Sequence, residues 1–343
     1  MDCFFAAVEV RENPLLKGKA IAIGGRANQR GVVATCSYEA RKYGVHSAMA
    51  MSRAIKICPD LIILPVRMDL YKQVSASIQA IFYEITDLVE PLSLDEAFLD
   101  VSAVDCCKGS ATLIAKEIRQ RIFDKEHITA SAGVASNKFL AKIASDWRKP
   151  NAQFVITPDK INDFILKLPV SKIFGVGKVT EKKMAAMGIF NCSDLQAYSE
   201  QQLSQHFGRF GIRLYQLARG IDDREVKIHR IRKSLSVEET YSQDLPNLEA
   251  CLLEIPDLFR QLMERLQRAR QSQVLQQKTA IIKIRFNDFE TTTLQLSSTR
   301  LNKQIFYKLC TKAWKRGKRP VRLIGIGVRF YPPDTAVQIE FDF

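Results

Sequence analysis

Two adjacent carboxylates, Asp95 and Glu96, stand in the segment PLSLDEAFLDVS between short apolar stretches. Like charges this close repel each other unless a cation neutralises them. A pair of Mg²⁺ ions about 4 Å apart would do so, and such a pair can hold an attacking hydroxyl and a leaving pyrophosphate in line. The two acids therefore indicate a metal-dependent transfer site, although an Asp-Glu dipeptide in a turn is more often solvated surface.

An excess of basic residues indicates a polyanionic partner. The 343 residues include 51 Lys and Arg against 37 Asp and Glu, a formal charge of +14, and basic side chains gain affinity by displacing counterions from phosphates. Much of the excess falls at positions 227–343, where 21 Lys and Arg stand against 12 Asp and Glu. Charge alone does not separate nucleic acid from anionic lipid or an acidic protein.

The composition argues against several other classes of protein. No apolar run approaches the ~20 residues that cross a bilayer, and the N-terminus MDCFFAAVEV carries acids where a secretory signal carries positive charge. We therefore expect a cytoplasmic protein without a membrane partner. The eight cysteines form no C-x-x-C pair and have no histidine at zinc-ligand spacing. They are expected to be reduced, which argues against a zinc hydrolase.

The first half of the chain alternates strand and helix patterns. A small β-rich unit is expected around AIAIGGRANQRGVVATCSY. Apolar residues recur every three or four positions over 68–86 and 111–126, which predicts amphipathic helices. The segments ITASAGVAS and AQFVIT are expected to be strands, with a helix opened by Asn137 between them. This α+β pattern predicts helices that cover one face of a sheet.

The second half contains two further modules. Residues 160–226 are helical in pattern with glycine-rich turns, and the basic stretch 227–237 has no apolar period and is expected to be a tether. After it, a helix with an apolar stripe, the strand IIKIRF, a helix after Asn302 and the strand LIGIGVRF predict a second α+β domain.

Five segments that follow one another along the chain closely resemble the Y-family DNA polymerases, in particular the bacterial ones. They are MDCFFAAVE, VVATCSYEARKYGV, PLSLDEAFLDVS, SAGVASNKFLAKIASDWRKPN and IFGVGKVTEKKM. The resemblance runs over essentially the whole chain, and the ordered set is much more specific than any single segment.

The resemblance implies an α+β multi-domain fold with a right-hand architecture. The expected parts are the palm (1–10 and 67–160), the fingers (11–66), a helical thumb with a helix-hairpin-helix (161–226), a linker (227–237) and a little finger (238–343). The implied activity is low-fidelity, template-directed DNA synthesis in translesion synthesis, DNA repair and mutagenesis. Primer-template DNA and dNTPs would be the substrates and two Mg²⁺ ions the cofactor, and the enzyme is expected to be a monomer.

The resemblance also assigns residues to the incoming nucleotide. The residues that match triphosphate contacts of the family are Thr35, Tyr38, Arg41 and Lys149. Phe5 matches the steric gate, a bulky ring beneath the sugar that leaves no room for a ribose 2′-OH. Without the motifs, the same side chains would be interpreted as solvated helix ends and ordinary packed aromatics.

A further set of residues is implied to hold DNA and a sliding clamp. In the thumb, Gly175, Gly177 and Lys178 match a hairpin whose backbone N–H groups bind phosphate. In the little finger, a basic sheet surface is expected from Lys283, Arg285, Arg322 and Arg329. The C-terminal QIEFDF resembles a clamp-binding peptide with Gln338, Phe341 and Phe343, and a terminal strand that packs its own phenylalanines is the alternative.

The N-terminus departs from the family pattern. Family members begin with an apolar strand that ends in a metal-binding aspartate immediately before the position of Met1, and this sequence lacks both. The backbone carbonyl of Met1 matches a metal ligand of the family, and Asp95 and Glu96 match its catalytic, metal-binding carboxylates. Either the protein extends upstream, which the intact later motifs favour, or the chain is a truncated, inactive DNA- or clamp-binding homologue. A nuclease that uses the same carboxylates is a third hypothesis.

Overall fold

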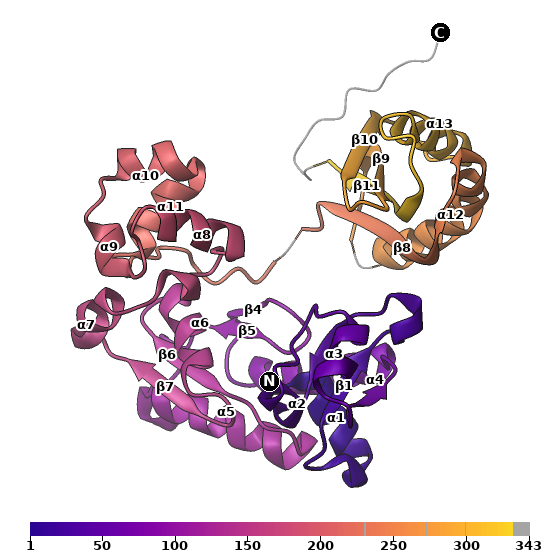
Figure 1. Ribbon diagram of the computed structural model, residues 1–343. Helices are drawn as coiled ribbons and strands as arrows, with labels where there is room; N and C mark the ends of the chain where they lie inside the picture. Colours follow the sequence, from indigo (N-terminus) through magenta and orange to yellow (C-terminus); the bar gives the residue numbers. More distant parts are fainter. Residues whose placement is uncertain (230, 272, 299, 332–343) are drawn as a thin grey trace. The chain divides into compact units, whose positions relative to one another are not determined.

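The computed structural model describes residues 1–229, 231–271, 273–298 and 300–331. The chain divides into two compact units (Figure 1). The first holds Met1–Gly24, Val33–Met49 and Ala54–His229. The second holds Gly25–Val32, Ala50–Arg53 and the described residues after His229.

The N-terminal part is a small sheet with helices beside it. Its elements in chain order are α1 (Phe4–Glu12), β1 (Ile21–Gly24), β2 (Val33–Cys36), α2 (Tyr38–Lys42), α3 (Met51–Ile57) and β3 (Ile62–Leu64). The central strand β1 pairs antiparallel with β2 and parallel with β3. All four residues of β1 are buried. The unit that the sequence predicts as β-rich therefore contains a buried central strand, and it also contains helices.

The following segment carries the carboxylates. Its elements are α4 (Met68–Tyr83), β4 (Val89–Pro91), β5 (Ala97–Leu99), α5 (Ala111–Glu126), β6 (Ala132–Ala135), α6 (Lys138–Trp147) and β7 (Gln153–Ile156). The predicted helices are confirmed, and the Asn137 side chain accepts a hydrogen bond from the Leu140 N–H at the start of α6, as an N-cap does.

The single sheet expected for this segment is wrong for the described residues. The strands form two separate pairs, β4 with β5 and β6 with β7. The first residues of the chain lie between the pairs: the Met1 nitrogen is 2.8 Å from the Asp95 carbonyl oxygen, and the Asp2 N–H donates to the Thr129 carbonyl. The N-terminal residues thus contact the turn between β4 and β5 and the loop before β6.

The region after β7 is helical, as the sequence predicts. It contains α7 (Ile161–Leu166), α8 (Lys178–Ala186), α9 (Cys192–Gln196), α10 (Glu200–Phe207) and α11 (Arg209–Leu217). Capping boxes at Asn191 and Ser199 start α9 and α10, which satisfies N–H groups that have no partner within the helix. Gly208, at φ 59°, ends α10 and is the N-cap of α11, so a glycine makes the turn between these two helices.

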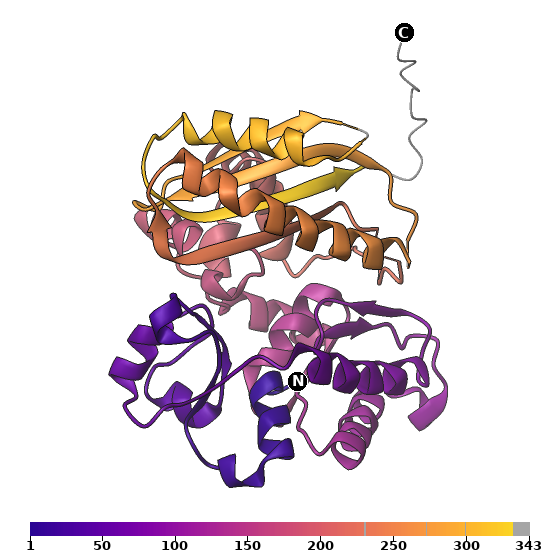
Figure 2. The ribbon, with the colours of Figure 1, turned by 90° about the vertical axis from the view of Figure 1, so that its right-hand side faces the viewer.

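The second unit is built around a four-stranded sheet. Its elements are β8 (Ser234–Leu245), α12 (Leu248–Arg270), β9 (Gln277–Phe286), β10 (Thr291–Ser297), α13 (Lys303–Trp314) and β11 (Val321–Phe330). The strand order is β10-β9-β11-β8, and every neighbouring pair is antiparallel. Both helices pack on the same face of the sheet (Figures 1 and 2).

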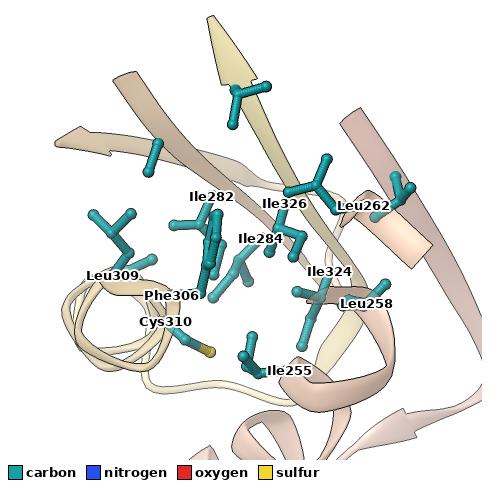
Figure 3. Packing of buried hydrophobic residues seen from close by; sticks show 14 of the residues in the cluster. Ile255, Leu258, Leu262, Ile282, Ile284, Phe306, Leu309, Cys310, Ile324 and Ile326 are labelled. Carbon is teal, nitrogen blue, oxygen red and sulfur yellow. The ribbon is translucent and has the colours of Figure 1, made fainter. Parts of the chain in front are cut away.

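The core of this unit lies between the sheet and the two helices. Figure 3 shows isoleucines of β9 and β11 facing Phe306 of α13 and Ile255 of α12. Ile282 and Ile284 are fully buried, as the alternation in IIKIRF predicts. Each such side chain contributes about 1.5–3 kcal/mol when it leaves water.

The tether predicted over 227–237 is too long, because β8 begins at Ser234. Leu235 and Val237 are buried on the core face and alternate with exposed residues. This short period-2 pattern directly follows a run of basic residues, which obscures it in the sequence. In the described part of the chain, no helix combines the length and apolar character of a membrane span.

Candidate active site

The turn between β4 and β5 presents the paired carboxylates. Leu92 N–H donates to the Glu96 carbonyl at 2.8 Å, which closes the turn, and the Ser93 hydroxyl donates to Asp95 Oδ1 at 2.8 Å. The side chains of Asp95 and Glu96 are 26% and 36% exposed, so both carboxylates are accessible to a ligand. The predicted position at the tip between two strands is confirmed.

A cavity of about 220 Å³ opens beside this turn. Its polar lining includes Asp95, Glu96, Lys142 and Lys149, and Met1 lies at the same cavity. Its apolar lining comes from β5, α5 and β6. An acidic pair and two lysines around one hollow form a site that suits a charged, phosphate-bearing ligand together with its counterions.

Sequence reasoning missed Lys142, whose ammonium is 2.6 Å from Glu96 Oε1. Lys138 stands one helical turn earlier on α6 and pairs with Glu90 of β4. Residues four apart share one face of a helix. Once α6 had been predicted, the spacing of the two lysines could therefore have indicated that both face the acid-containing hairpin.

Lys149 pairs with a neighbouring acid of α6. Its ammonium is 2.6 Å from Asp146 Oδ1. Burial lowers the pKa of Lys149, but the nearby charges of Asp146, Glu96 and Asp2 outweigh burial and raise that pKa above its usual value. Lys149 is therefore a permanent cation next to the paired carboxylates.

The residues of the N-terminal part that are predicted to contact the triphosphate lie in α2 or shortly before it. Tyr38 and Arg41 belong to α2, and the Arg41 guanidinium lies 5.1 Å from the centre of the Tyr38 ring. Burial, followed by the charge of Asp2, raises the pKa of the Tyr38 hydroxyl above its usual range. Thr35 is a half-buried residue of β2, three residues before α2 begins. The structure thus places Tyr38 and Arg41 next to the N-terminal residues.

The two phenylalanines of α1 differ in environment. Phe4 is 4% exposed and belongs to the core, whereas Phe5 is only partly buried. The Phe5 ring stacks on Tyr71 of α4, with ring centres 4.1 Å apart and an interplanar angle of 11°. Phe5 is therefore the ring of the two that a ligand can reach.

A glycine-containing turn precedes α8 at the position of the predicted hairpin. Gly177 caps α8, and the exposed Lys178 is its first residue. Gly175 has φ +102°, and a Cβ there would lie 3.0 Å from the Phe210 ring, so both backbone conformation and packing favour glycine. The N-terminal N–H groups of α8 face out of this turn, which suits an anion.

The basic residues of the second unit fall into two groups. Lys283 and Arg285 of β9 point away from the core. Arg329 of β11 lies on the same face of the sheet, because an even number of residues separates it from the β11 residues that pair with Lys283 and Arg285. Glu238 pairs with Lys283 at 2.8 Å and neutralises part of this face. Arg322 is not part of the alternation, because it is the extra residue at a register shift, and its guanidinium lies over the Phe289 ring.

The expected clamp-binding residues Gln338, Phe341 and Phe343 lie outside the described residues.

Comparisons with known proteins cover nearly the whole chain. The model of the impB/mucB/samB family matches residues 1–146, and that of its C-terminal domain matches 232–341. The model described as the DNA polymerase-iota thumb domain matches residues 171–222. DNA polymerase IV of Legionella pneumophila (strain Paris) is 52% identical over 340 residues, 99% of this chain and 95% of that protein. DNA polymerase IV of Pseudomonas syringae pv. syringae (strain B728a) is 53% identical over 96% of this chain and 93% of that protein.

Solved structures give the same result. The Y-family DNA polymerase chimera Dbh-Dpo4(243-245)-Dbh is similar at a TM-score of 0.85 and 28% identity, over 96% of each chain. This chain belongs to the Y-family DNA polymerases. The structure titled "Insertion ternary complex of Dbh DNA polymerase" is similar to it at a TM-score of 0.67 and 29% identity, also over 96% of each chain. The predicted family and fold class are confirmed.

The residues at the cavity suit the metal dependence of Y-family polymerases. In the stretches that the structure describes, no cluster of three or more His, Cys, Asp or Glu could hold a metal ion. Mg²⁺ commonly takes only one or two carboxylates and obtains its other ligands from water and substrate phosphates. Asp95 and Glu96 are oxygen donors of this kind, so the donor set fits a hard cation that binds together with a triphosphate.

Proposed function

We propose that this chain is a low-fidelity, template-directed DNA polymerase that acts in translesion synthesis, and thereby in DNA repair and mutagenesis. The observation that carries the proposal is the accessible Asp95–Glu96 pair in a cavity that also contains Lys142 and Lys149. The substrates would be primer-template DNA and dNTPs. The curated relatives are named DNA polymerase IV, so the alternative of an inactive homologue has no support from them.

The reaction joins the primer 3′-hydroxyl to the α-phosphate of a dNTP and releases pyrophosphate. Two Mg²⁺ ions, held by Asp95, Glu96 and the Met1 carbonyl, would lower the charge of the triphosphate and favour the deprotonated hydroxyl. Lys149 and Arg41 neutralise phosphate oxygens, and the guanidinium can donate two parallel hydrogen bonds. Tyr38 and Thr35 contribute hydroxyl groups to the same phosphates.

The duplex would be held without reading its sequence. The backbone N–H groups at Gly177 and Lys178 can bind one phosphate group. Lys283, Arg285 and Arg329 can neutralise phosphates along the sheet of the second unit, with Arg322 beside them. Because Glu238 already pairs with Lys283, Arg285 and Arg329 are expected to contribute more to DNA affinity than Lys283.

A primer-extension assay tests the proposal. A labelled primer on a longer template, with Mg²⁺ and a single dNTP, should lengthen by one nucleotide only when that dNTP matches the template base. A template with a bulky adduct should still be copied. A nuclease would shorten the primer instead, and an inactive homologue would bind the duplex and leave the primer length unchanged.

Replacing Phe5 with Ala should allow ribonucleotides into the site. Removing the ring removes the clash with a 2′-OH, and we expect the dNTP-over-rNTP ratio of kcat/KM to fall by at least about tenfold. The matched control is Phe4→Leu, which changes the buried neighbour. An unchanged ratio in Phe5→Ala would contradict the assignment of Phe5 beneath the sugar.

Deleting residues 338–343 should reduce synthesis stimulated by a sliding clamp and spare basal synthesis. The peptide QIEFDF offers one amide and two phenylalanines for an apolar groove. The measurement is primer extension with and without clamp loaded on the template. Equal stimulation of the full-length and shortened chains would count against a clamp-binding role.

A further inference from the structure

The aromatic ring that backs Phe5 is itself fixed from behind. Tyr71 is fully buried and stacks almost parallel to Phe5, with ring centres 4.1 Å apart. The Tyr71 hydroxyl donates a 2.6 Å hydrogen bond to Glu9 Oε1. The ring therefore has a packed face toward Phe5 and a polar anchor at its far end, which restricts both its tilt and its sliding.

The anchor is an ion pair between the buried Glu9 and Arg67, whose side chain is 44% exposed. Glu9 is 5% exposed, and its two carboxylate oxygens accept hydrogen bonds from Arg67 Nε at 2.9 Å and Nη2 at 2.5 Å. This bidentate geometry is the strong form of an arginine–carboxylate contact. Burial raises the pKa of Tyr71 to about 12, and the hydrogen bond to Glu9 acts in the same direction. At neutral pH, Tyr71 is therefore a fixed, protonated donor to a fixed carboxylate.

The four residues form two pairs at helical spacing. Phe5 and Glu9 are four residues apart on α1. Arg67 caps α4, and Tyr71 lies four residues later on that helix. Since residues four apart share a face, α1 presents a ring and a carboxylate to a ring and a guanidinium of α4. Displacing either member of the ion pair would be transmitted to Phe5 through the Tyr71 ring.

We propose that the Glu9–Arg67 ion pair, acting through Tyr71, positions the Phe5 ring and thereby sets how strictly the polymerase excludes ribonucleotides. The inference rests on the proposed function, since it concerns the sugar of the incoming nucleotide. Exclusion by a clash depends on where the ring stands to within a fraction of an ångström, and such precision comes from the residues that support the contacting side chain. Arg67 and Tyr71 are positioning residues and need not touch the nucleotide.

The experiment compares the dNTP-over-rNTP ratio of kcat/KM in three variants. Tyr71→Phe keeps the stacked ring and removes only its anchor, and Arg67→Gln leaves Glu9 without its cation. Each should lower the ratio by about tenfold while dNTP incorporation is largely retained. Arg67→Lys keeps the charge and should recover part of the ratio.

The matched control is Arg11→Gln. It breaks the pairing of Arg11 with Glu126, 2.5 Å apart, at the other end of the helix that carries Phe5. It should lower stability and leave the ratio unchanged. An unchanged ratio in both Tyr71→Phe and Arg67→Gln overturns the inference, and so does an equal fall in Arg11→Gln. If the unaltered chain incorporates no dNTP, the proposed function fails, and this inference fails with it.

Discussion

Replacing Asp95 with Asn and Glu96 with Gln in one chain should lower kcat/KM for dNTP incorporation by at least about 10³-fold. The amides keep the size of the side chains and remove both negative charges. Lys142 then loses its contact with Glu96, while Asp146 still pairs with Lys149, and the cavity no longer offers the paired carboxylates that would attract a divalent cation. The measurement is single-turnover primer extension at saturating DNA.

Asp87→Asn supplies the matched control for this experiment. Asp87 is an exposed acid just before β4 and does not line the cavity. Its replacement removes a similar charge close by in the sequence and should leave the incorporation rate unchanged. Similar losses in the control and in the double variant would show that overall charge, and not the paired site, sets the rate.

Asp222→Ala should strongly destabilise the first unit. The Asp222 side chain is fully buried and joins three partners: Arg213 of α11 at 2.7 Å, Arg224 at 2.8 Å, and the N–H of Phe139 at the start of α6 at 3.0 Å. Burial raises the pKa of Asp222, but hydrogen bonds from Arg224 and Arg213 outweigh burial and hold that pKa far below its usual range. The carboxylate is therefore ionised and connects the helical region to α6.

The expected loss in the free energy of unfolding is about 2–4 kcal/mol. Truncation leaves the Phe139 N–H without its partner, and it separates two cations from their shared anion. The arginine side chains are 25% and 48% exposed, so they can turn to water, which keeps the loss below that of a wholly buried pair. Urea unfolding followed by circular dichroism measures the change. The exposed neighbour Asp223→Ala is the control, and equal midpoints for the two variants would contradict the prediction.

Local patterns predicted those parts of the fold that depend on neighbours in the sequence. The helix expected at 111–126 has those bounds in the structure, and Asn137 caps α6 as expected. The position of Asp95 and Glu96 in a turn could also be predicted, because short apolar stretches on both sides read as a hairpin. Each of these features depends on interactions between residues within about four positions of one another in the chain.

Features that depend on distant contacts could not be predicted in this way. The strands β4 and β5 pair separately from β6 and β7, and no local pattern reports which strands pair. Arg322 and Arg329 are seven residues apart, so strict alternation would place them on opposite faces of the sheet, and a register shift in β11 removes Arg322 from the alternation altogether. Glu9 and Arg67 are 58 residues apart, so their pairing becomes visible only when α1 packs against α4.

The central claim is that the carboxylates at 95 and 96 bring divalent cations to a triphosphate. The most direct test is electron paramagnetic resonance of Mn²⁺ bound to the chain in complex with a dideoxy-terminated primer, its template and the matching dNTP. We predict tightly bound Mn²⁺ in the unaltered chain and in Asp87→Asn, and its loss in the Asp95→Asn, Glu96→Gln double variant. Mn²⁺ binding of the same strength and stoichiometry in the double variant would contradict the account.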